Sequence, residues 1–394
     1  MPKVLRILNR FNLGGPTYNA AYLTKYLAPD FETLLVGGAI DEHEESSMHI
    51  TDRLGLTPLI IPEMKREISP FNDYKAYQTI KKIIKDFKPD IVHTHASKSG
   101  LLGRMAASAM QVPVIIHTFH GHVFHSYFGK AKSEIYQKLE RYAAQKSSAI
   151  IAISEKQKHE LCNIYRICTP EKTHIIPLGF ELDKFNTNKE EKRSLFRKRW
   201  NISEDEIAIG IVGRLVPIKN HKLFIDAIKI MNGKTTQKIR AFIVGNGELR
   251  KELEDYCQSQ NIAYSNTSQP SSITFTSWLK EIDEVNAGMD IIALTSFNEG
   301  TPVSLIEAQA ASKPIVSTNV GGIENIVLEN ETAFLTPSNN KAQFAEKLLL
   351  LAESEELRKK MGLKSWDFVY KNYTFQRLAN DTKQLYFSLL NEKN

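Results

Sequence analysis

The sequence predicts an α/β protein built from two doubly wound domains, each with a parallel β-sheet. Short runs of β-branched residues alternate with helical stretches from one end of the chain to the other, a rhythm typical of parallel sheets. At 394 residues the chain is too long for one comfortable core, which favours two domains. Its composition, with 42% hydrophobic and 24% charged residues, is that of a globular protein in water.

The first half of the chain has the elements of one such domain. Its expected strands are Val4–Leu8, Thr33–Val36, Pro58–Ile61, Ile91–His95, Val114–Thr118, Ala149–Ile153 and His174–Pro177. The helices expected between these strands include Thr17–Leu27, Lys75–Phe87, Leu101–Met110 and Lys132–Lys146. We therefore predict an N-terminal domain over residues 1–180.

The second half repeats this rhythm. Its expected strands are Ile207–Val212, Arg240–Val244, Ile273–Thr276, Asp290–Thr295 and Ile315–Thr318. A polar and highly charged stretch, residues 181–203, separates the halves and indicates a linker with an exposed helix. We predict a C-terminal domain over residues 190–372 and a last helix at about 373–394. Ligands bind such folds at the carboxyl ends of the strands, so we expect one crevice in each half.

Bulk properties favour a cytoplasmic protein. The three cysteines are widely placed and odd in number, which fits a reducing compartment. No apolar run approaches the roughly 20 residues that span a bilayer, and the N-terminus has no signal-peptide core. The net charge of +6 falls mostly in the N-terminal half. That bias suits an anionic acceptor or a peripheral contact with the inner face of a membrane, and an ordinary solvated surface is the alternative. We expect no nucleic-acid partner.

The most informative stretch runs from Ser296 to Ala308, where an expected strand gives way to a helix. Thr301 and Pro302 mark the start of that helix, because Thr is a good N-cap and Pro is favoured at the first helical position. The turn offers free backbone N–H groups and the positive end of a helix dipole, which attract a phosphate. The residues expected to line this anion site are Gly300, Thr301, Pro302 and Val303.

Two carboxylates flank the anion site. Glu299 precedes the helix, and Glu307 lies about a turn and a half inside it. A phosphate repels a carboxylate unless the carboxylate accepts hydrogen bonds from neutral groups, such as sugar hydroxyls. A phosphate together with hydroxyls describes a nucleotide sugar. The alternative is an ordinary strand-turn-helix with an acidic residue in the first helical turn.

Three other strand-to-helix turns carry glycine, which lets the backbone approach a ligand closely. They are Gly14-Gly15, the loop from Gly213 to Lys219, and Gly245-Asn246-Gly247. Arg214 and Lys219 share the second of these loops and can converge on a diphosphate, Arg through its planar fork and Lys as a point charge. None of the turns has the third glycine of the dinucleotide fingerprint. Tight turns and solvated cations are the alternatives.

Four histidines lie within nine residues, at positions 117, 120, 122 and 125, and raise the question of a zinc site. His117 and His120 fall at a strand-to-loop junction, and no Cys or acidic residue lies nearby to complete a tetrahedral set. No Asp-x-Asp follows a strand, so a divalent ion has no visible ligand set either. We expect no metal, and simple turn or core positions for His117, His122 and His125.

The run from Glu299 to Glu307 resembles the Glu-x7-Glu signature of retaining glycosyltransferases of the GT-B fold, family 4 (glycosyl transferases group 1). The loop from Gly213 to Asn220 is similar to the Gly-Arg-Leu…Lys-Asn motif of that family, and the likeness extends over nearly the whole chain. The resemblance implies two Rossmann-like domains that face each other across a cleft. The N-terminal domain would bind the acceptor and the C-terminal domain the nucleotide sugar, with the last helix crossing back onto the N-terminal domain.

The resemblance also implies roles for single residues. Arg214 and Lys219 would stabilise the departing diphosphate in place of a metal. Glu299 would hold hydroxyls of the donor sugar and Glu307 those of the ribose, while His120 would lie beside the donor sugar. The remaining donor-site residues implied are Gly14, Gly15, Gly213, Gly245, Asn246, Gly247, Ser277 and Trp278.

Two of the implied assignments keep an alternative. Trp278 would stack on the base or simply pack, and His93 and His95, at another strand end, would line the acceptor side or serve the structure. A double-displacement mechanism needs a carboxylate nucleophile, and the sequence nominates none. The resemblance implies instead a front-face route that retains the anomeric configuration, with the departing phosphate accepting the proton of the acceptor.

We therefore expect a metal-independent retaining glycosyltransferase without a cofactor. It would move a hexose or N-acetylhexosamine from a nucleotide sugar to a saccharide or lipid-linked acceptor, in cell-surface polysaccharide biosynthesis. A UDP-sugar is the expected donor because UDP-sugars are the commonest donors in this family. The alternatives are a nucleotide-sugar 2-epimerase on the same fold and a catalytically silent carbohydrate-binding or scaffold relative.

Overall fold

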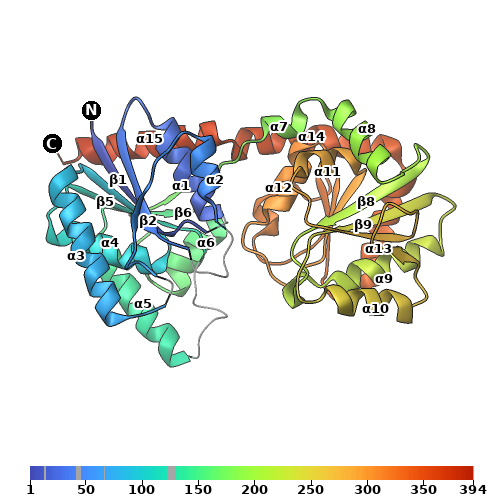
Figure 1. Ribbon diagram of the computed structural model, residues 1–394, viewed down its shortest axis with the longest axis horizontal. Helices are drawn as coiled ribbons and strands as arrows, with labels where there is room; N and C mark the ends of the chain where they lie inside the picture. The colour runs from blue at the N-terminus through green and yellow to red at the C-terminus, as the bar shows by residue number, and fades with distance from the viewer. Residues whose placement is uncertain (13–14, 41–45, 66, 122–129, 394) are drawn as a thin grey trace. The chain divides into compact units, whose positions relative to one another are not determined.

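The computed structural model describes residues 1–12, 15–40, 46–65, 67–121 and 130–393, which form two compact units. The first unit comprises Met1–Phe180 with Tyr373–Asn394, and the second comprises Glu181–Asn372. Within the described residues each unit has one seven-stranded sheet, and all strand pairs inside the sheets are parallel (Figure 1). The predicted class, two doubly wound α/β domains with parallel sheets, is therefore confirmed.

The first unit begins with an inner strand of its sheet, β1, which pairs with β2 and β4. Its strand order is β3-β2-β1-β4-β5-β6-β7, so the order reverses between β1 and β4. The strands are β1 (Lys3–Arg10), β2 (Glu32–Gly38), β3 (Leu59–Ile61), β4 (Ile91–His95), β5 (Val114–Phe119), β6 (Ala149–Ala152) and β7 (Thr173–Ile175). The helices are α1 (Gly15–Tyr26), α2 (Met48–Arg53), α3 (Pro70–Phe87), α4 (Ser97–Ala109), α5 (Lys130–Gln145), α6 (Glu155–His159), the π-helical η1 (Glu160–Ile164) and α15 (Phe375–Asn391).

Helices cover both faces of the first sheet. On one face, α1 and α15 bury Leu23 and Tyr386 in a core that includes Val4 of β1. On the other face, α3 buries Ile80 in a core that includes Leu5, the next residue of β1. Successive strand residues point to opposite faces, so one apolar strand supplies both cores. The last helix thus belongs to the first unit, although 192 residues of the second unit separate it in sequence.

The second unit repeats the architecture, with an additional edge strand, β10, on one side of its sheet and one strand fewer on the other. Its strand order is β10-β11-β9-β8-β12-β13-β14, and the order reverses between β8 and β12. The strands are β8 (Glu206–Val212), β9 (Lys238–Val244), β10 (Tyr264–Ser265), β11 (Ile273–Ser277), β12 (Ile291–Leu294), β13 (Ile315–Thr318) and β14 (Ala333–Thr336). The helices are α7 (Asp183–Asn186), α8 (Lys189–Arg199), η2 (Pro217–Lys219), α9 (His221–Asn232), α10 (Arg250–Ser259), α11 (Ile282–Gly288), α12 (Val303–Ala310), η3 (Ile323–Asn325), α13 (Lys341–Glu353) and α14 (Glu355–Tyr373).

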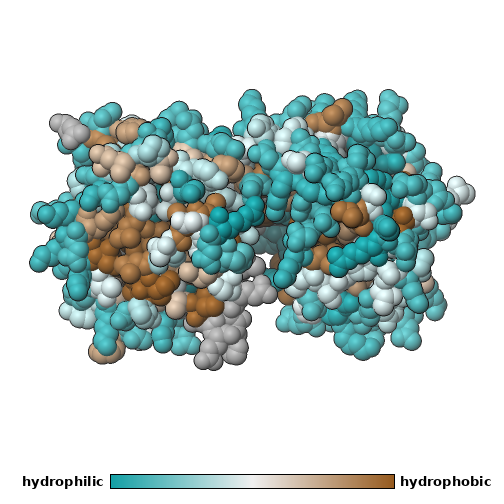
Figure 2. Space-filling model, turned by 45° about the horizontal axis from the view of Figure 1, so that its top comes forward, coloured by the Kyte–Doolittle hydropathy of each residue, from teal (hydrophilic) through white to brown (hydrophobic). Residues whose placement is uncertain are grey.

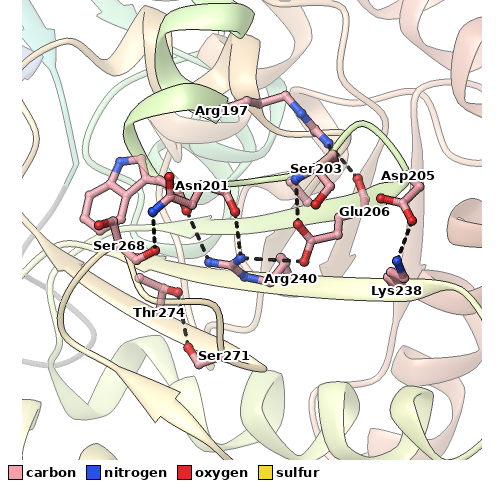
Figure 3. Close-up of polar contacts among 12 residues, drawn as sticks. Arg197, Asn201, Ser203, Asp205, Glu206, Lys238, Arg240, Ser268, Ser271 and Thr274 are labelled. Atoms are coloured by element: carbon pink, nitrogen blue, oxygen red, sulfur yellow. Dashed lines mark hydrogen bonds and ion pairs between the residues drawn. The ribbon is translucent and has the colours of Figure 1, made fainter.

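Two arginines fasten the amino ends of the strands in the second sheet (Figure 3). Arg240 donates to the main-chain oxygen of Asn201 at 3.3 Å and lies 3.6 Å from the Glu206 carboxylate. Arg197 donates to the main-chain oxygen of Glu206 at 2.8 Å and pairs with Asp290 at 3.3 Å. These contacts are buried or nearly so, and they close the amino edge of the sheet, opposite to the carboxyl edge where ligands bind in such folds.

The stretch between the units differs from the prediction of a linker with an exposed helix. Phe196 of α8 is 2% exposed and packs against Phe242 of β9, with 5.8 Å between ring centroids. Arg197 is buried as well, because its charge is paired with Asp290. The many charged residues of α8 made it look exposed throughout, but one face carries a buried aromatic ring. Because this ring packs against β9, α8 is part of the second unit.

Hydrophilic residues cover most of the face drawn in Figure 2, and hydrophobic residues gather into patches on it. In the first unit, Phe71 and Tyr74 at the start of α3 are 67% and 62% exposed. Among the residues that the structure describes, no helix combines the length and apolar character needed to cross a bilayer.

Candidate active site

The loops that follow β8 and β12 meet at the point where the second sheet reverses its strand order. Lys219 Nζ lies 2.6 Å from Glu299 Oε1, and Ser296 Oγ donates to the same carboxylate oxygen at 2.5 Å. Both charged side chains are partly buried, with 20% and 11% of their side-chain surface exposed. The structure thus joins two predicted site residues that lie 80 positions apart in the sequence.

Hydrogen bonds tie the main chain of these two loops together. Thr295 Oγ1 donates to the main-chain oxygen of Lys219 at 2.8 Å. The main-chain N–H of Phe297 donates to the main-chain oxygen of Ile218 at 2.8 Å. Because both loops are anchored to strand ends, the Lys219–Glu299 pair is held by main-chain geometry as well as by its own charges.

A glycine pair after β13 supports the turn that carries Glu299. A Cβ on Gly321 would stand 1.9 Å from the main-chain oxygen of Glu299, and one on Gly322 would stand 2.1 Å from that of Gly300. The φ of Gly321 is +61°, a left-handed value that favours glycine. The Gly322 N–H donates to the Glu299 main-chain oxygen at 3.0 Å. Only glycine fits this contact.

The loop after β9 lies directly against the loop after β8. A Cβ on Gly245, whose φ is +145°, would stand 1.9 Å from the main-chain oxygen of Gly213, and one on Gly247 would stand 2.5 Å from that of Leu215. The Leu215 N–H donates to the main-chain oxygen of Asn246 at 3.0 Å. The two glycine loops predicted to flank the donor are therefore neighbours in space.

Arg214 lies in different surroundings from Lys219. Its side chain is exposed and makes no hydrogen bond or ion pair with any residue that the structure describes. Lys219, five positions on, is engaged by Glu299. The loop after β8 therefore carries one cation that is free for an external anion and one that is already oriented.

The helix of the predicted anion site begins later than expected. α12 starts at Val303 with Pro302 as its N-cap, so the expectation that Thr301 is the N-cap and Pro302 the first helical residue is wrong. Pro302 has no side-chain acceptor, and the first-turn N–H groups have no side-chain cap. Gly300 is exposed, and Thr301 is partly exposed beside it. The uncapped helix start keeps the features that attract an anion.

Glu307 lies inside α12 in a different electrostatic setting from Glu299. Burial raises the pKa of Glu307 to about 7, with Lys184 acting against this rise and Asp283 adding to it. No ion pair with a described residue offsets the burial. Hydroxyl groups that donate hydrogen bonds to this carboxyl group would stabilise its ionised form and lower its pKa.

No motif singled out Arg250, which occupies the place of a third glycine after Gly247. Arg250 donates to Ser277 Oγ at 3.2 Å and to Asn266 Oδ1 at 2.9 Å. It thereby links the loop after β9 to the end of β11. Trp278, next to Ser277, is 51% exposed and lines a cavity with Phe196, Arg199, Leu279, Lys280, Glu281, Glu284 and Val285.

In the first unit, the end of β5 holds the remaining predicted catalytic residue, His120. Its Nε2 lies 2.9 Å from Nδ1 of His95, at the end of the neighbouring strand β4. Arg6 of β1 reaches His95 Nε2 at 3.4 Å and His93 Nδ1 at 3.1 Å. Tyr386 of α15 lies 2.6 Å from the same atom of His93. Arg6 and Tyr386 were absent from the predicted site, since neither lies in a recognisable motif.

The imidazoles of this cluster are neutral. Burial, with smaller effects of Arg6 and His120, holds the pKa of His93 well below its usual value. Burial is also the main cause of the lowered pKa of His95, and it lowers the pKa of His120 to about 3. His117 is separate, because its Nδ1 meets Thr94 Oγ1 at 2.8 Å.

Several predicted positions fall outside the described residues. Gly14, His122 and His125 are among them, whereas Gly15 begins α1. Within the described ranges, no three His, Cys, Asp or Glu side chains are grouped as metal ligands would be. The roles of the individual site residues stay predictions.

Comparison with known proteins identifies the class. The family model of the glycosyl transferases group 1 matches residues 192–365, and that of glycosyltransferase family 4 matches residues 14–184. The chain is 30% identical, over 87% of its own length and 87% of the relative, to the UDP-Gal:alpha-D-GlcNAc-diphosphoundecaprenol alpha-1,3-galactosyltransferase of Escherichia coli. It therefore belongs to the group 1 glycosyltransferases and is a glycosyltransferase.

Two further proteins bear on the fold and the family. The capsular polysaccharide biosynthesis glycosyltransferase CapM of Staphylococcus aureus is 26% identical over 84% of this chain and 85% of its own. The crystal structure of Anabaena HepE in complex with UDP superposes with a TM-score of 0.78, at 18% identity, over 98% of this chain and 100% of HepE. The predicted GT-B fold is confirmed.

Proposed function

We propose that this glycosyltransferase moves a hexose or N-acetylhexosamine from a UDP-sugar to a saccharide or lipid-linked acceptor, with retention of configuration and without a metal. Three relatives support the substrate classes. The E. coli relative is named for UDP-Gal and a diphosphoundecaprenol-linked acceptor, CapM for capsular polysaccharide biosynthesis, and HepE was crystallised with UDP. We accordingly place this chain in cell-surface polysaccharide biosynthesis, with a peripheral membrane contact through its basic first unit.

The observation that carries the proposal is the Lys219–Glu299 pair beside the free cation Arg214. A diphosphate needs positive charge where its own charge builds up as the sugar leaves, and one preorganised donor of this kind is typically worth about 3–4 kcal/mol. Lys219 has three donors, so it can contact a phosphate while it keeps Glu299 oriented. Arg214 adds the fork that matches phosphate oxygens.

The acidic residues complete the donor site. Glu299, fixed by Lys219 and Ser296, accepts hydrogen bonds from the sugar hydroxyls. Glu307 accepts those of the ribose, and the uncapped start of α12 binds a phosphate. In the first unit, His120 is the residue that we assign to the donor sugar.

The reaction then needs no protein nucleophile. The bond between the anomeric carbon and the diphosphate oxygen breaks, and the acceptor oxygen forms its bond on the same face of the sugar. The proton of the acceptor hydroxyl passes to the departing phosphate oxygen. Lys219 and Arg214 stabilise the negative charge of the diphosphate during this step.

A panel of nucleotide sugars tests the proposal. Thermal unfolding with each donor should show a shift for UDP and UDP-sugars, because a ligand that binds only the folded state raises the melting temperature. Transfer from the selected donor to an undecaprenyl-diphosphate-sugar analogue is then followed by NMR, and the product anomer should match the donor. An inverted anomer would refute retention. Conversion of the nucleotide sugar without an acceptor would favour the 2-epimerase alternative.

A further inference from the structure

A buried hydrogen-bond chain leads from β1 to His120. Arg6 lies on β1, His95 on β4 and His120 just after β5, three neighbouring strands of the first sheet. Arg6 Nη1 lies 3.4 Å from His95 Nε2, and His95 Nδ1 lies 2.9 Å from His120 Nε2. Arg6 and His95 are fully buried.

The chemistry of the guanidinium fixes the direction of this chain. A guanidinium has only donors, so His95 Nε2 must accept and carries no proton. A neutral imidazole then carries its proton on Nδ1, and His95 Nδ1–H donates to His120 Nε2. His120 Nε2 is therefore an acceptor as well. The proton of His120 must lie on its Nδ1.

A second branch supports the same polarity. Arg6 Nη2 donates to the Tyr386 hydroxyl at 3.2 Å, and that hydroxyl lies 2.6 Å from His93 Nδ1. His93 Nε2 lies 2.7 Å from Thr118 Oγ1. With the Tyr386 hydroxyl donating to Nδ1, His93 carries its proton on Nε2 and donates to Thr118. Arg6 Nη1 also lies 3.1 Å from His93 Nδ1, which is a second reason for that nitrogen to be an acceptor.

The chain ends in a donor without a partner. His120 Nδ1 is a buried atom, and it makes no hydrogen bond within the part of the chain that the structure describes. A buried polar group left without a partner is rare in proteins and calls for an explanation. His117 has the opposite arrangement, since Thr94 engages its Nδ1 and its Nε2 is the buried nitrogen that makes no hydrogen bond with a described residue.

We propose that Arg6, acting through His95, holds His120 in the Nδ1–H form, so that His120 presents a neutral donor to an oxygen atom of a bound sugar. The inference rests on the proposed function for the identity of that sugar. Arg6 and His95 are positioning residues. His120 cannot act as a general base, because the lone pair of Nε2 is engaged by His95 and Nδ1 bears the proton. Its neutrality follows from burial, which lowers the pKa of His120 to about 3.

The tautomer is measurable without substrate. In protein labelled with 15N-histidine, two-bond 1H–15N correlations at pH 7.5 distinguish the Nδ1–H from the Nε2–H form. The signals of His120 are assigned by their loss in His120→Gln. We expect His120 and His95 in the Nδ1–H form and His93 in the Nε2–H form. An Nε2–H form of His120, or a His120 that titrates between pH 6 and 8, would overturn the inference.

Variants test the role of Arg6. Arg6→Met removes the donor while filling similar space, so His120 should lose its fixed tautomer and turnover should fall at least tenfold. The dissociation constant for UDP should change less than twofold. Arg6→Lys should restore part of the turnover and part of the Nδ1–H population of His120. The control is Arg104→Met with Glu140→Leu, which replaces a buried ion pair of the same unit and should leave the His120 tautomer unchanged. A wild-type tautomer in folded Arg6→Met would contradict the role of Arg6. If Arg6→Met does not fold, the wild-type spectrum decides.

The two proposals fail in different ways. If the spectra show the expected tautomers but no UDP-sugar supports transfer, the proposed function fails and the assignment of the hydrogen-bond chain stands. If transfer occurs and His120 carries its proton on Nε2, the proposed function stands and this inference fails.

Discussion

The two sheets are both parallel and both reverse their strand order once, but the residues at the two reversal points differ in charge. Between β1 and β4 of the first unit, Arg6 is buried among neutral imidazoles that accept hydrogen bonds from its Nη1 atom. Between β8 and β12 of the second unit, a charged pair, Lys219 and Glu299, lies partly exposed beside Arg214, which pairs with no described residue. The fold fixes where a ligand can bind, and the residues at the strand ends decide which ligand. The second reversal point suits a diphosphate, and the first suits neutral donors and acceptors.

Removing the oriented cation of the second unit should have the largest effect. Lys219→Ala takes away a donor to the diphosphate and leaves Glu299 as an unpaired carboxylate beside it. We expect turnover to fall roughly 100- to 1,000-fold, measured as UDP release with the preferred donor. The matched control is Lys238→Ala at the amino edge of the same sheet, where the ion pair with Asp205 is solvent-exposed; its turnover should not change. An unaltered rate in Lys219→Ala would remove the diphosphate role from this residue.

The glycine contacts of the second unit should be the next most sensitive. Gly245→Ala places a Cβ against the Gly213 main-chain oxygen at a φ of +145°. We expect a loss of about 2–4 kcal/mol in the free energy of unfolding from backbone strain and overpacking, measured by urea titration. Gly300→Ala is the control, because a Cβ there meets no atom within 4 Å and should leave stability within about 0.5 kcal/mol. Equal stability of the two variants would show that the loop after β9 yields freely.

Near neutral pH, the stability of the protein should depend on the titration of Glu307 in the second unit. The pKa of Glu307, about 7, lies above the ordinary value of 4.5, so the folded protein holds a proton that the unfolded chain has released between these values. Stability therefore falls as pH rises through this window. Glu307→Gln should raise the free energy of unfolding at pH 8 by at most about 3 kcal/mol and change it little at pH 4. A gain of the same size at both pH values would show that the pKa of Glu307 is ordinary.

The same carboxyl group should link UDP binding to pH. Ribose hydroxyls stabilise the ionised form of Glu307, so binding releases its proton below pH 7 and UDP affinity should rise with pH up to about 7. Isothermal titration of UDP from pH 6 to 8 measures this slope. In Glu307→Gln, UDP affinity should depend less on pH, because the contribution of Glu307 is gone. The contribution from the titration of UDP itself remains in both proteins. An unchanged slope in the variant would place the titrating group elsewhere.

The smallest effect is expected from metal removal. If Arg214, Lys219 and the start of α12 supply the positive potential, EDTA should leave turnover within about twofold, because one missing preorganised charge would cost far more. The assay compares initial rates in EDTA-treated protein with and without added Mg²⁺ or Mn²⁺. A complete loss of activity that one metal restores would contradict the metal-independent mechanism.

Sequence patterns predicted the elements and the loops because both are local. The glycine residues of strand-to-helix turns indicated Gly213, Gly245 and Gly300 as site residues. The Glu-x7-Glu signature indicated Glu299 and Glu307. Contacts between distant segments could not be predicted in this way. The Lys219–Glu299 bond spans 80 residues and the Arg6–Tyr386 bond spans 380.

Where the structure differs from the prediction, the local pattern was compatible with more than one outcome. Pro302 caps α12 rather than starting it, although its ring suits either position. Most residues of α8 are charged, so its composition indicated an exposed helix. The structure nevertheless buries Phe196 and Arg197, which is paired with Asp290. Arg250 follows a glycine turn and carries no motif of its own, yet it joins two loops of the candidate site.

A crystal structure of the protein with UDP tests the central claim most directly. We predict the diphosphate within hydrogen-bond distance of Lys219 and Arg214, at the start of α12, with the ribose hydroxyls on Glu307. UDP bound at the neutral imidazoles of the first unit, or away from the loops after β8 and β12, would contradict the account.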